Sequence, residues 1–113
     1  MGYDKGEIKT SPNIATVGRM LLVFSQQWDG ERPGIVVRMG VGEGQDQAVN
    51  INVMLDGPRD QKLLEGLRRS VQGNTFHAIR VYDALTPTER EVMVAEHGMI
   101  AEWPRLPTVA ARA

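Results

Sequence analysis

The chain has 113 residues, enough for one domain with a modest core, and it contains no cysteine, which excludes disulfide bonds and thiolate chemistry. Thirteen Lys and Arg residues against fourteen Asp and Glu residues give a formal net charge of -1, so the chain lacks the overall positive charge that favours non-specific nucleic-acid binding. The longest apolar run, Met20 to Phe24, is too short to cross a bilayer, and the N-terminus lacks a secretory signal pattern. We therefore expect a cytoplasmic protein.

The two ends of the chain differ in composition from its middle. Residues 1–13 have Tyr3 and Ile8 as their anchoring apolar side chains, and the end of the chain is rich in Pro and Ala. Such segments bury too little apolar surface to offset the entropy that is lost on ordering. We expect a flexible N-terminal arm at residues 1–13, a single β-barrel domain at residues 14–104 and a flexible C-terminal tail at residues 105–113.

The first predicted strand covers residues 17–25. Both of its faces are apolar, because Leu21 and Val23 alternate with Leu22 and Phe24. Strands of this kind are usually central in their sheet or covered on both sides. The pattern therefore predicts a buried strand but leaves open which of the two pairs points into the core.

A tight turn leads to the second predicted strand. Asp29 and Gly30 form a dipeptide that is typical of hairpin turns, and Pro33 suits the entry to a strand, where no backbone donor is needed. Residues 35–39 predict the second strand, and the Gly-rich residues 40–47 predict a hairpin loop. Because a strand rather than a helix follows these glycines, the loop does not match a phosphate-binding loop.

The third predicted strand, residues 48–55, has the clearest alternation in the chain. One face holds apolar side chains and the other is mainly polar, which is the period of a half-buried strand. The predicted inner face comprises Val49, Ile51, Val53 and Leu55, and the outer face comprises Asn50, Asn52 and Met54.

A helix is predicted after this strand, over residues 61–72. Asp60 is placed to cap it, Gly73 to end it, and an apolar stripe runs along one side. The stripe comprises Leu63, Leu64, Leu67 and Val71.

A second helix is predicted from the strongest capping signal in the chain. Thr86 as cap, Pro87 in the first helical position and Glu89 three residues after the cap form a capping box, and Gly98 would end the helix. Because residues 92–95 are consecutively apolar, a strand over residues 89–97 is the alternative.

Two further strands flank this helix. Residues 75–82 predict a fourth strand, although its apolar side chains are too evenly spread to show which face is buried. Residues 99–103 predict a short fifth strand. Five short strands with one or two short helices predict a mainly β fold, a small five-stranded SH3-like or OB-like barrel, because closure removes exposed strand edges.

Six residues are candidates for interaction. Trp28 lies in the first turn beside Arg32, so it could serve as a binding anchor or cover one end of the barrel. The other four could form a basic helical face for phosphates or an acidic partner, although the net charge favours the alternative of an ordinary solvated face. These four residues are Arg59, Lys62, Arg68 and Arg69.

No catalytic, metal-binding or cofactor-binding motif is expected. His77 and His97 are the only imidazoles, and no carboxylate pattern marks them as metal ligands or as parts of a catalytic triad. We expect a strand histidine and a helix-end histidine, the latter favoured by the helix dipole. The sequence indicates no enzyme, no cofactor and no small-molecule substrate.

Four short motifs follow one another along the central segments: Arg32-Pro33 followed by Ile35-Val36, Val49-Asn50 before Val53, Asp56-Gly57, and Trp103-Pro104. This pattern resembles that of a group of small tailed-phage and prophage proteins without an assigned activity. Gly34 stands where the group has Ala, and the group is shorter where this chain has residues 61–72. The resemblance implies a small barrel of phage or prophage origin.

Together these observations favour a non-enzymatic assembly or interaction module. It would work in the bacterial cytoplasm or as a minor virion component, with protein partners or self-association as a homo-oligomer, and without a membrane. A small nucleic-acid-binding barrel is the alternative, because such barrels often present strands and loops to single strands.

Overall fold

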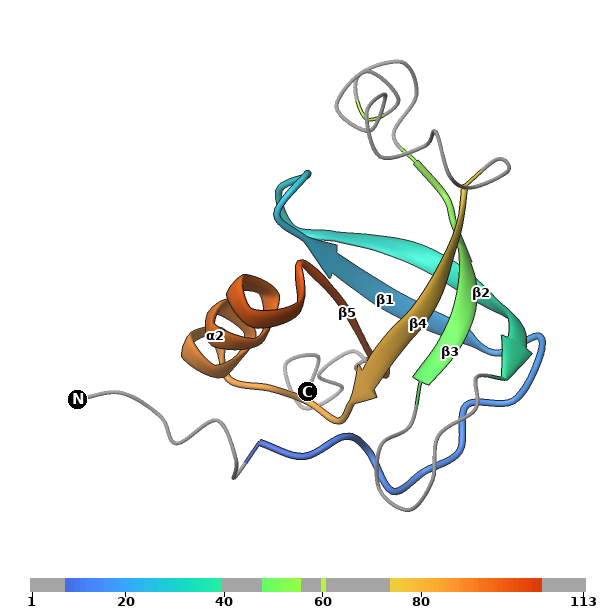
Figure 1. Ribbon diagram of the computed structural model, residues 1–113, viewed down its shortest axis with the longest axis horizontal. Helices are drawn as coiled ribbons and strands as arrows, with labels where there is room; N and C mark the ends of the chain where they lie inside the picture. Colours follow the sequence, from blue (N-terminus) through green and yellow to red (C-terminus); the bar gives the residue numbers. More distant parts are fainter. Residues whose placement is uncertain (1–7, 40–47, 56–59, 61–73, 105–113) are drawn as a thin grey trace, which may run out of the picture.

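A computed structural model describes residues 8–39, 48–55, 60 and 74–104 of the chain. Within these residues it contains five strands and one helix (Figure 1). In chain order they are β1 (Met20–Ser25), β2 (Glu31–Met39), β3 (Ala48–Val53), β4 (Thr75–Tyr82), α2 (Pro87–His97) and β5 (Met99–Glu102). Several predicted segments lie outside the described residues: residues 1–7 of the predicted arm, the loop at 40–47, the helix at 61–72 with its stop at Gly73, and the tail at 105–113.

The five strands form one closed barrel in the order β1-β2-β3-β4-β5, which confirms the predicted small β-barrel. The first four strands form an antiparallel meander, and β5 closes the barrel by pairing antiparallel with β1 and parallel with β4. A parallel pair needs a crossover connection, which α2 supplies between β4 and β5. In Figure 1, α2 lies outside the barrel wall beside β5.

The barrel interior is filled from the alternating faces of the strands. In β1, Leu21 and Val23 are fully buried, so this pair faces the core and Leu22 and Phe24 do not. The predicted inner face of β3 is confirmed by three buried side chains, whereas the strand itself ends before Leu55. These three side chains are Val49, Ile51 and Val53.

The first hairpin is longer than the sequence predicted. Gly30 adopts a φ of 70°, which few residues other than glycine tolerate, and β2 begins at Glu31 rather than at Ile35. Pro33 lies within the strand opposite Leu22, so it does not mark the strand entry. A proline is accepted in a strand where its nitrogen is not needed as a donor.

The first strand, by contrast, begins later than predicted, at Met20. Gly18 adopts a φ of 90° in a turn just before it. The N–H of Gly18 donates to the Val36 carbonyl at 2.8 Å, and the N–H of Val36 donates to the Arg19 carbonyl at 2.9 Å. These bonds attach the segment before β1 to the middle of β2.

A β-bulge explains why the inward face of β4 could not be predicted. Ile51 pairs with Phe76 and Val49 with Ile79, so β4 uses one more residue than β3 over the same stretch. Phe76 and Ile79 are therefore both buried although three positions separate them. Ala78 lies at this bulge, and its backbone adopts a φ of 56°.

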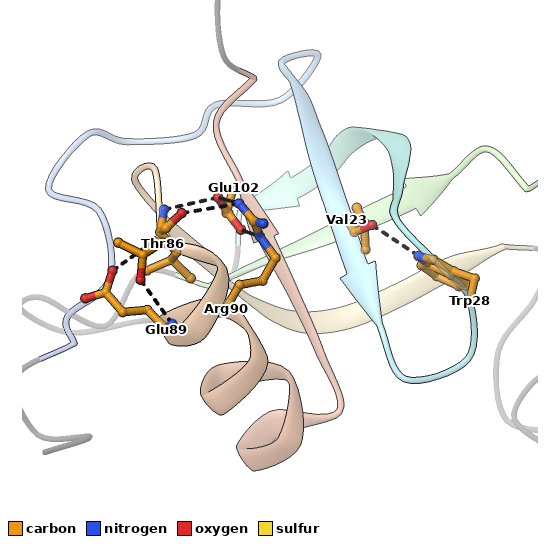
Figure 2. A network of polar contacts seen from close by, with 7 residues as sticks. Val23, Trp28, Thr86, Glu89, Arg90 and Glu102 are labelled. Atoms are coloured by element: carbon orange, nitrogen blue, oxygen red, sulfur yellow. Dashed lines mark hydrogen bonds and ion pairs between the residues drawn. The ribbon is translucent and has the colours of Figure 1, made fainter. Parts of the chain in front are cut away.

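The capping box of α2 is confirmed. The Thr86 hydroxyl accepts from the Glu89 N–H at 3.2 Å, and the Glu89 carboxylate accepts from the Thr86 N–H at 2.9 Å (Figure 2). Gly98 ends the helix with a φ of 81°. The alternative of a strand over residues 89–97 is wrong, because Pro87–His97 form a helix, from which Met93 packs in one apolar cluster with Tyr82 and Ile100.

The packed fold begins before the predicted boundary at Ile14. Thr10 and Ser11 are buried, although both belong to the segment that was expected to be a loose arm. The N–H of Ser11 donates to the Val81 carbonyl at 2.7 Å, and its hydroxyl donates to Asp83 at 2.7 Å. These polar bonds to the end of β4 hold a segment whose apolar content alone does not predict order.

Candidate interaction surfaces

Trp28 belongs to the hydrophobic core and is not an exposed anchor. Only 7% of its surface is accessible, and its indole N–H donates to the Val23 carbonyl at 3.2 Å (Figure 2). A buried indole needs such a partner for its single donor. Of the two predicted roles, the structure favours the one in which Trp28 covers an end of the barrel.

The Arg32 guanidinium forms its contacts within the chain. Its Nε and Nη2 atoms donate to the Asp60 carboxylate at 2.6 and 3.2 Å, and its Nη1 atom donates to the carbonyls of Asp29 and Glu31. The guanidinium carbon lies 5.9 Å from the Trp28 ring centroid. Asp60 is fully buried, so Arg32 supplies the charge that this carboxylate needs.

The other predicted candidates form no described site. Arg59, Lys62, Arg68 and Arg69 lie outside the described residues. His77 is exposed at the β4 bulge and His97 is exposed in the last turn of α2. Within the part of the chain that the structure describes, no group of three or more His, Cys, Asp or Glu side chains could hold a metal ion.

An apolar surface that the sequence analysis missed lies on the outside of the barrel. Among the described residues, seven large hydrophobic side chains are more than a third exposed, and they come from the segment before β1, from the start of β1, from β2 and from the position after β3. We call this set the apolar face: Ile14, Val17, Met20, Ile35, Val37, Met39 and Met54.

Strand pairing brings three of these residues together on the outer surface of the sheet. Met20 lies directly opposite Ile35 in the β1–β2 pair. Val37 is exposed two positions further on, at the irregularity of β2 between Val36 and Arg38. The N–H of Met54 donates to the Pro33 carbonyl at 2.8 Å, which places Met54 beside the same part of β2. Neighbouring side chains on one face of a sheet are close enough to form a continuous patch.

The charged residues beside the apolar face are basic. Arg19 precedes Met20 and stacks over the Trp103 ring at 5.4 Å, and Arg38 lies exposed between Val37 and Met39. No ion pair joins either arginine to a carboxylate within the described residues. The described rim of this surface is therefore positive.

A groove lies between α2 and the turn that joins β1 to β2. It has a volume of about 350 Å³ and combines apolar and acidic side chains. One wall comes from Phe24, Ser25, Gln26, Trp28, Asp29 and Gly30, and the other comes from Pro87, Arg90, Glu91, Val94 and Ala95. We call it the α2 groove.

Arg90, which lines the α2 groove, is neutralised by a buried carboxylate. Nη2 of Arg90 donates to Oε1 of Glu102 at 3.0 Å and its Nε donates to Oε2, while Glu102 itself is 2% exposed (Figure 2). This hydrogen bond raises the pKa of Arg90 above its ordinary value, and Glu31 also raises it. The guanidinium carbon lies 4.3 Å from the Phe24 ring centroid, which places the cation over the aromatic face.

The remaining charges of the groove are negative. Asp29 and Glu91 are exposed at its two walls, and no described ion pair neutralises them. A partner that fits the α2 groove therefore offers apolar side chains together with positive charge.

Comparison with protein-family models, with curated proteins and with solved structures finds no match to this chain. Among the described residues, no helix is long and apolar enough to cross a membrane.

Proposed function

We propose that this protein is a non-enzymatic assembly or interaction module. The apolar face is the observation that carries the proposal. Its seven side chains together expose an apolar area on the order of several hundred Å², and apolar patches of this size are often functional. Arg90, which lines the α2 groove, supports a structural role, because it is bonded to the buried Glu102 and to the Leu85 carbonyl.

The proposed setting is a phage or prophage, in which the protein acts in the bacterial cytoplasm or as a minor virion component. Its support is the sequence resemblance carried by Arg32-Pro33, Val49-Asn50 and Trp103-Pro104. We expect an antibody against the protein to detect it in particles purified on a density gradient. Its absence from both the particles and their assembly intermediates contradicts the virion part of the proposal.

The assembly role is tested by light scattering behind a sizing column, at low and at moderate salt, with and without a single-stranded oligonucleotide. A discrete oligomer that ignores the oligonucleotide is the expected result. A strict monomer that also fails to bind any phage protein in a pairwise screen counts against the proposal.

A nucleic-acid-binding barrel is the second candidate, favoured by the exposed Arg19 and Arg38 beside the apolar face. Strand order weighs against the OB-like form of this candidate, because β1 to β5 follow one another without a Greek-key connection. This candidate predicts binding that weakens steeply with salt and falls when Arg19 and Arg38, or Arg68 and Arg69, are replaced by Ala. Unchanged affinity in both double variants would exclude it.

A further inference from the structure

We propose that the apolar face of one copy docks on the α2 groove of a second copy, in a head-to-tail contact. The proposal rests on the assembly role and names the partner, which is this chain itself. Two different surfaces of the same molecule have complementary composition, one apolar with arginines and the other apolar with carboxylates.

Burial of apolar surface supplies the main driving force. A stable interface needs about 800 Å² from each partner, and the apolar face supplies a large share of it before its polar rim is counted. The groove offers a shallow receptor with Phe24, Val94 and Ala95 in its walls. A formal net charge of -1 adds little repulsion between two copies.

Charge complementarity favours a contact between the apolar face and the α2 groove over a contact between two apolar faces. Arg19 and Arg38 accompany the apolar face, whereas Asp29 and Glu91 border the groove around an arginine that Glu102 already neutralises. Docking the face on the groove therefore brings unlike charges together. A two-fold contact between two apolar faces would instead place Arg19 and Arg38 near their own copies, and like charges across an interface oppose binding.

Both surfaces lie on one barrel, so one molecule cannot dock its own apolar face in its own groove. Met20 of the apolar face and Phe24 of the groove are four positions apart in β1, about 13 Å at roughly 3.3 Å per residue, and Val37 to Met39 lie at the far end of β2. Contacts between two different surfaces continue from copy to copy. They give a ring if the rotation between copies closes and a filament if it does not.

The test uses two variants, one that blocks the apolar face and one that blocks the α2 groove. Val17→Glu together with Met54→Glu blocks the apolar face at two exposed positions outside the strands, and Ala95→Arg blocks the groove with a bulky cation at an exposed helix position. His77→Glu and Ala84→Arg, exposed and outside both surfaces, are the matched controls. Circular dichroism and thermal unfolding confirm that every variant is folded.

Sedimentation velocity and light scattering then measure each variant alone and the two blocked variants mixed in equal amounts. We expect each blocked variant to be a monomer and both controls to assemble like the wild type. The mixture should give a heterodimer of twice the chain mass, because one intact face meets one intact groove and growth stops there.

Other results overturn the proposal in distinguishable ways. A groove-blocked variant that dimerises alone, while the face-blocked variant stays monomeric in the mixture, indicates a face-to-face dimer and leaves the assembly role standing. Wild-type assembly that neither blocked variant alters shows that another surface is used. A wild type that is monomeric at its highest soluble concentration overturns the self-docking and counts against the assembly role as well.

A charge exchange provides a second, milder test. Arg38→Glu and Glu91→Arg should each weaken assembly at least tenfold at low salt, and the two changes combined in one chain should restore most of it. Failure of the combined variant to recover, with both single variants folded, contradicts the charge pairing on which the direction of docking depends.

Discussion

Arg90 of α2 and Glu102 of β5 form a two-point ion pair, with Nη2 and Oε1 at 3.0 Å, where the crossover helix meets the strand that closes the barrel. The same carboxylate accepts from the N–H of Leu85 at 3.2 Å. Glu102 therefore joins the start of the α2 connection to the last strand, in a place that water hardly reaches.

Replacing Glu102 by Ala is expected to lower the free energy of unfolding by about 1 to 3 kcal/mol, because the buried Leu85 N–H loses its partner, whereas Arg90 is 23% exposed and can still reach water. Glu102→Gln keeps the shape and should cost less. Urea unfolding measures both, and the exposed Glu91→Ala is the control, with an expected change within about 0.5 kcal/mol. A Glu102→Ala variant as stable as the control would show that the pair is not structural.

Arg32→Ala should also destabilise the fold by about 3 to 5 kcal/mol, because the fully buried Asp60 would lose its ion-pair partner. Arg32→Lys should recover only part of this loss, since an ammonium group cannot reproduce the two-point contact. Arg38→Ala, at an exposed position on the same strand, is the matched control. Thermal unfolding at neutral pH compares the three variants.

Gly34→Ala is expected to cost about 1 to 3 kcal/mol through overpacking. A Cβ atom at this position would lie 2.8 Å from Cδ1 and Cγ1 of Ile51 and 3.1 Å from Cγ2 of Val23. Because Ile51 is fully buried, it has little room to move. A double-mutant cycle with Ile51→Ala should show that the added methyl costs less once the opposing side chain is removed, whereas additive effects would contradict the steric explanation.

Ala78→Gly should stabilise the protein by about 1 kcal/mol, because a left-handed conformation strains a residue that carries a Cβ atom. Ala48→Gly in β3 provides the contrast, since glycine at an ordinary strand position destabilises. Denaturant midpoints that fall for both glycine variants would show that Ala78 is not strained.

Removing the Asn50 side chain should lower the free energy of unfolding by about 1 kcal/mol, because its oxygen accepts from the Ala78 N–H at 3.1 Å.

Local signals in the sequence predicted the elements that depend on neighbouring residues. The capping box at Thr86 and Glu89 needs only groups within one helical turn, and the alternation around Ile51 follows directly from strand geometry. The β4 bulge escaped prediction because an extra residue at Ala78 breaks the two-residue period.

The candidate surfaces depend on contacts that are distant in sequence. Arg32 and Asp60 are 28 positions apart, so their pairing had no local signal. Ile35 and Val36 are both apolar, and only the assembled barrel shows that Ile35 is exposed while Val36 is buried. Glu102 did have a usable signal, because it is the single charged residue of an otherwise apolar strand.

Closure of the barrel by β5 has a consequence for synthesis of the chain. Leu22 pairs with Glu102, so a nascent chain must be translated almost to the end of the described residues before its first strand finds its second neighbour. Until then, β1 and β4 remain open edges beside uncovered apolar side chains. Pairing between such distant segments is slow to form, and ribosome stalling before Glu102 should leave a chain that relies on chaperones and is degraded readily.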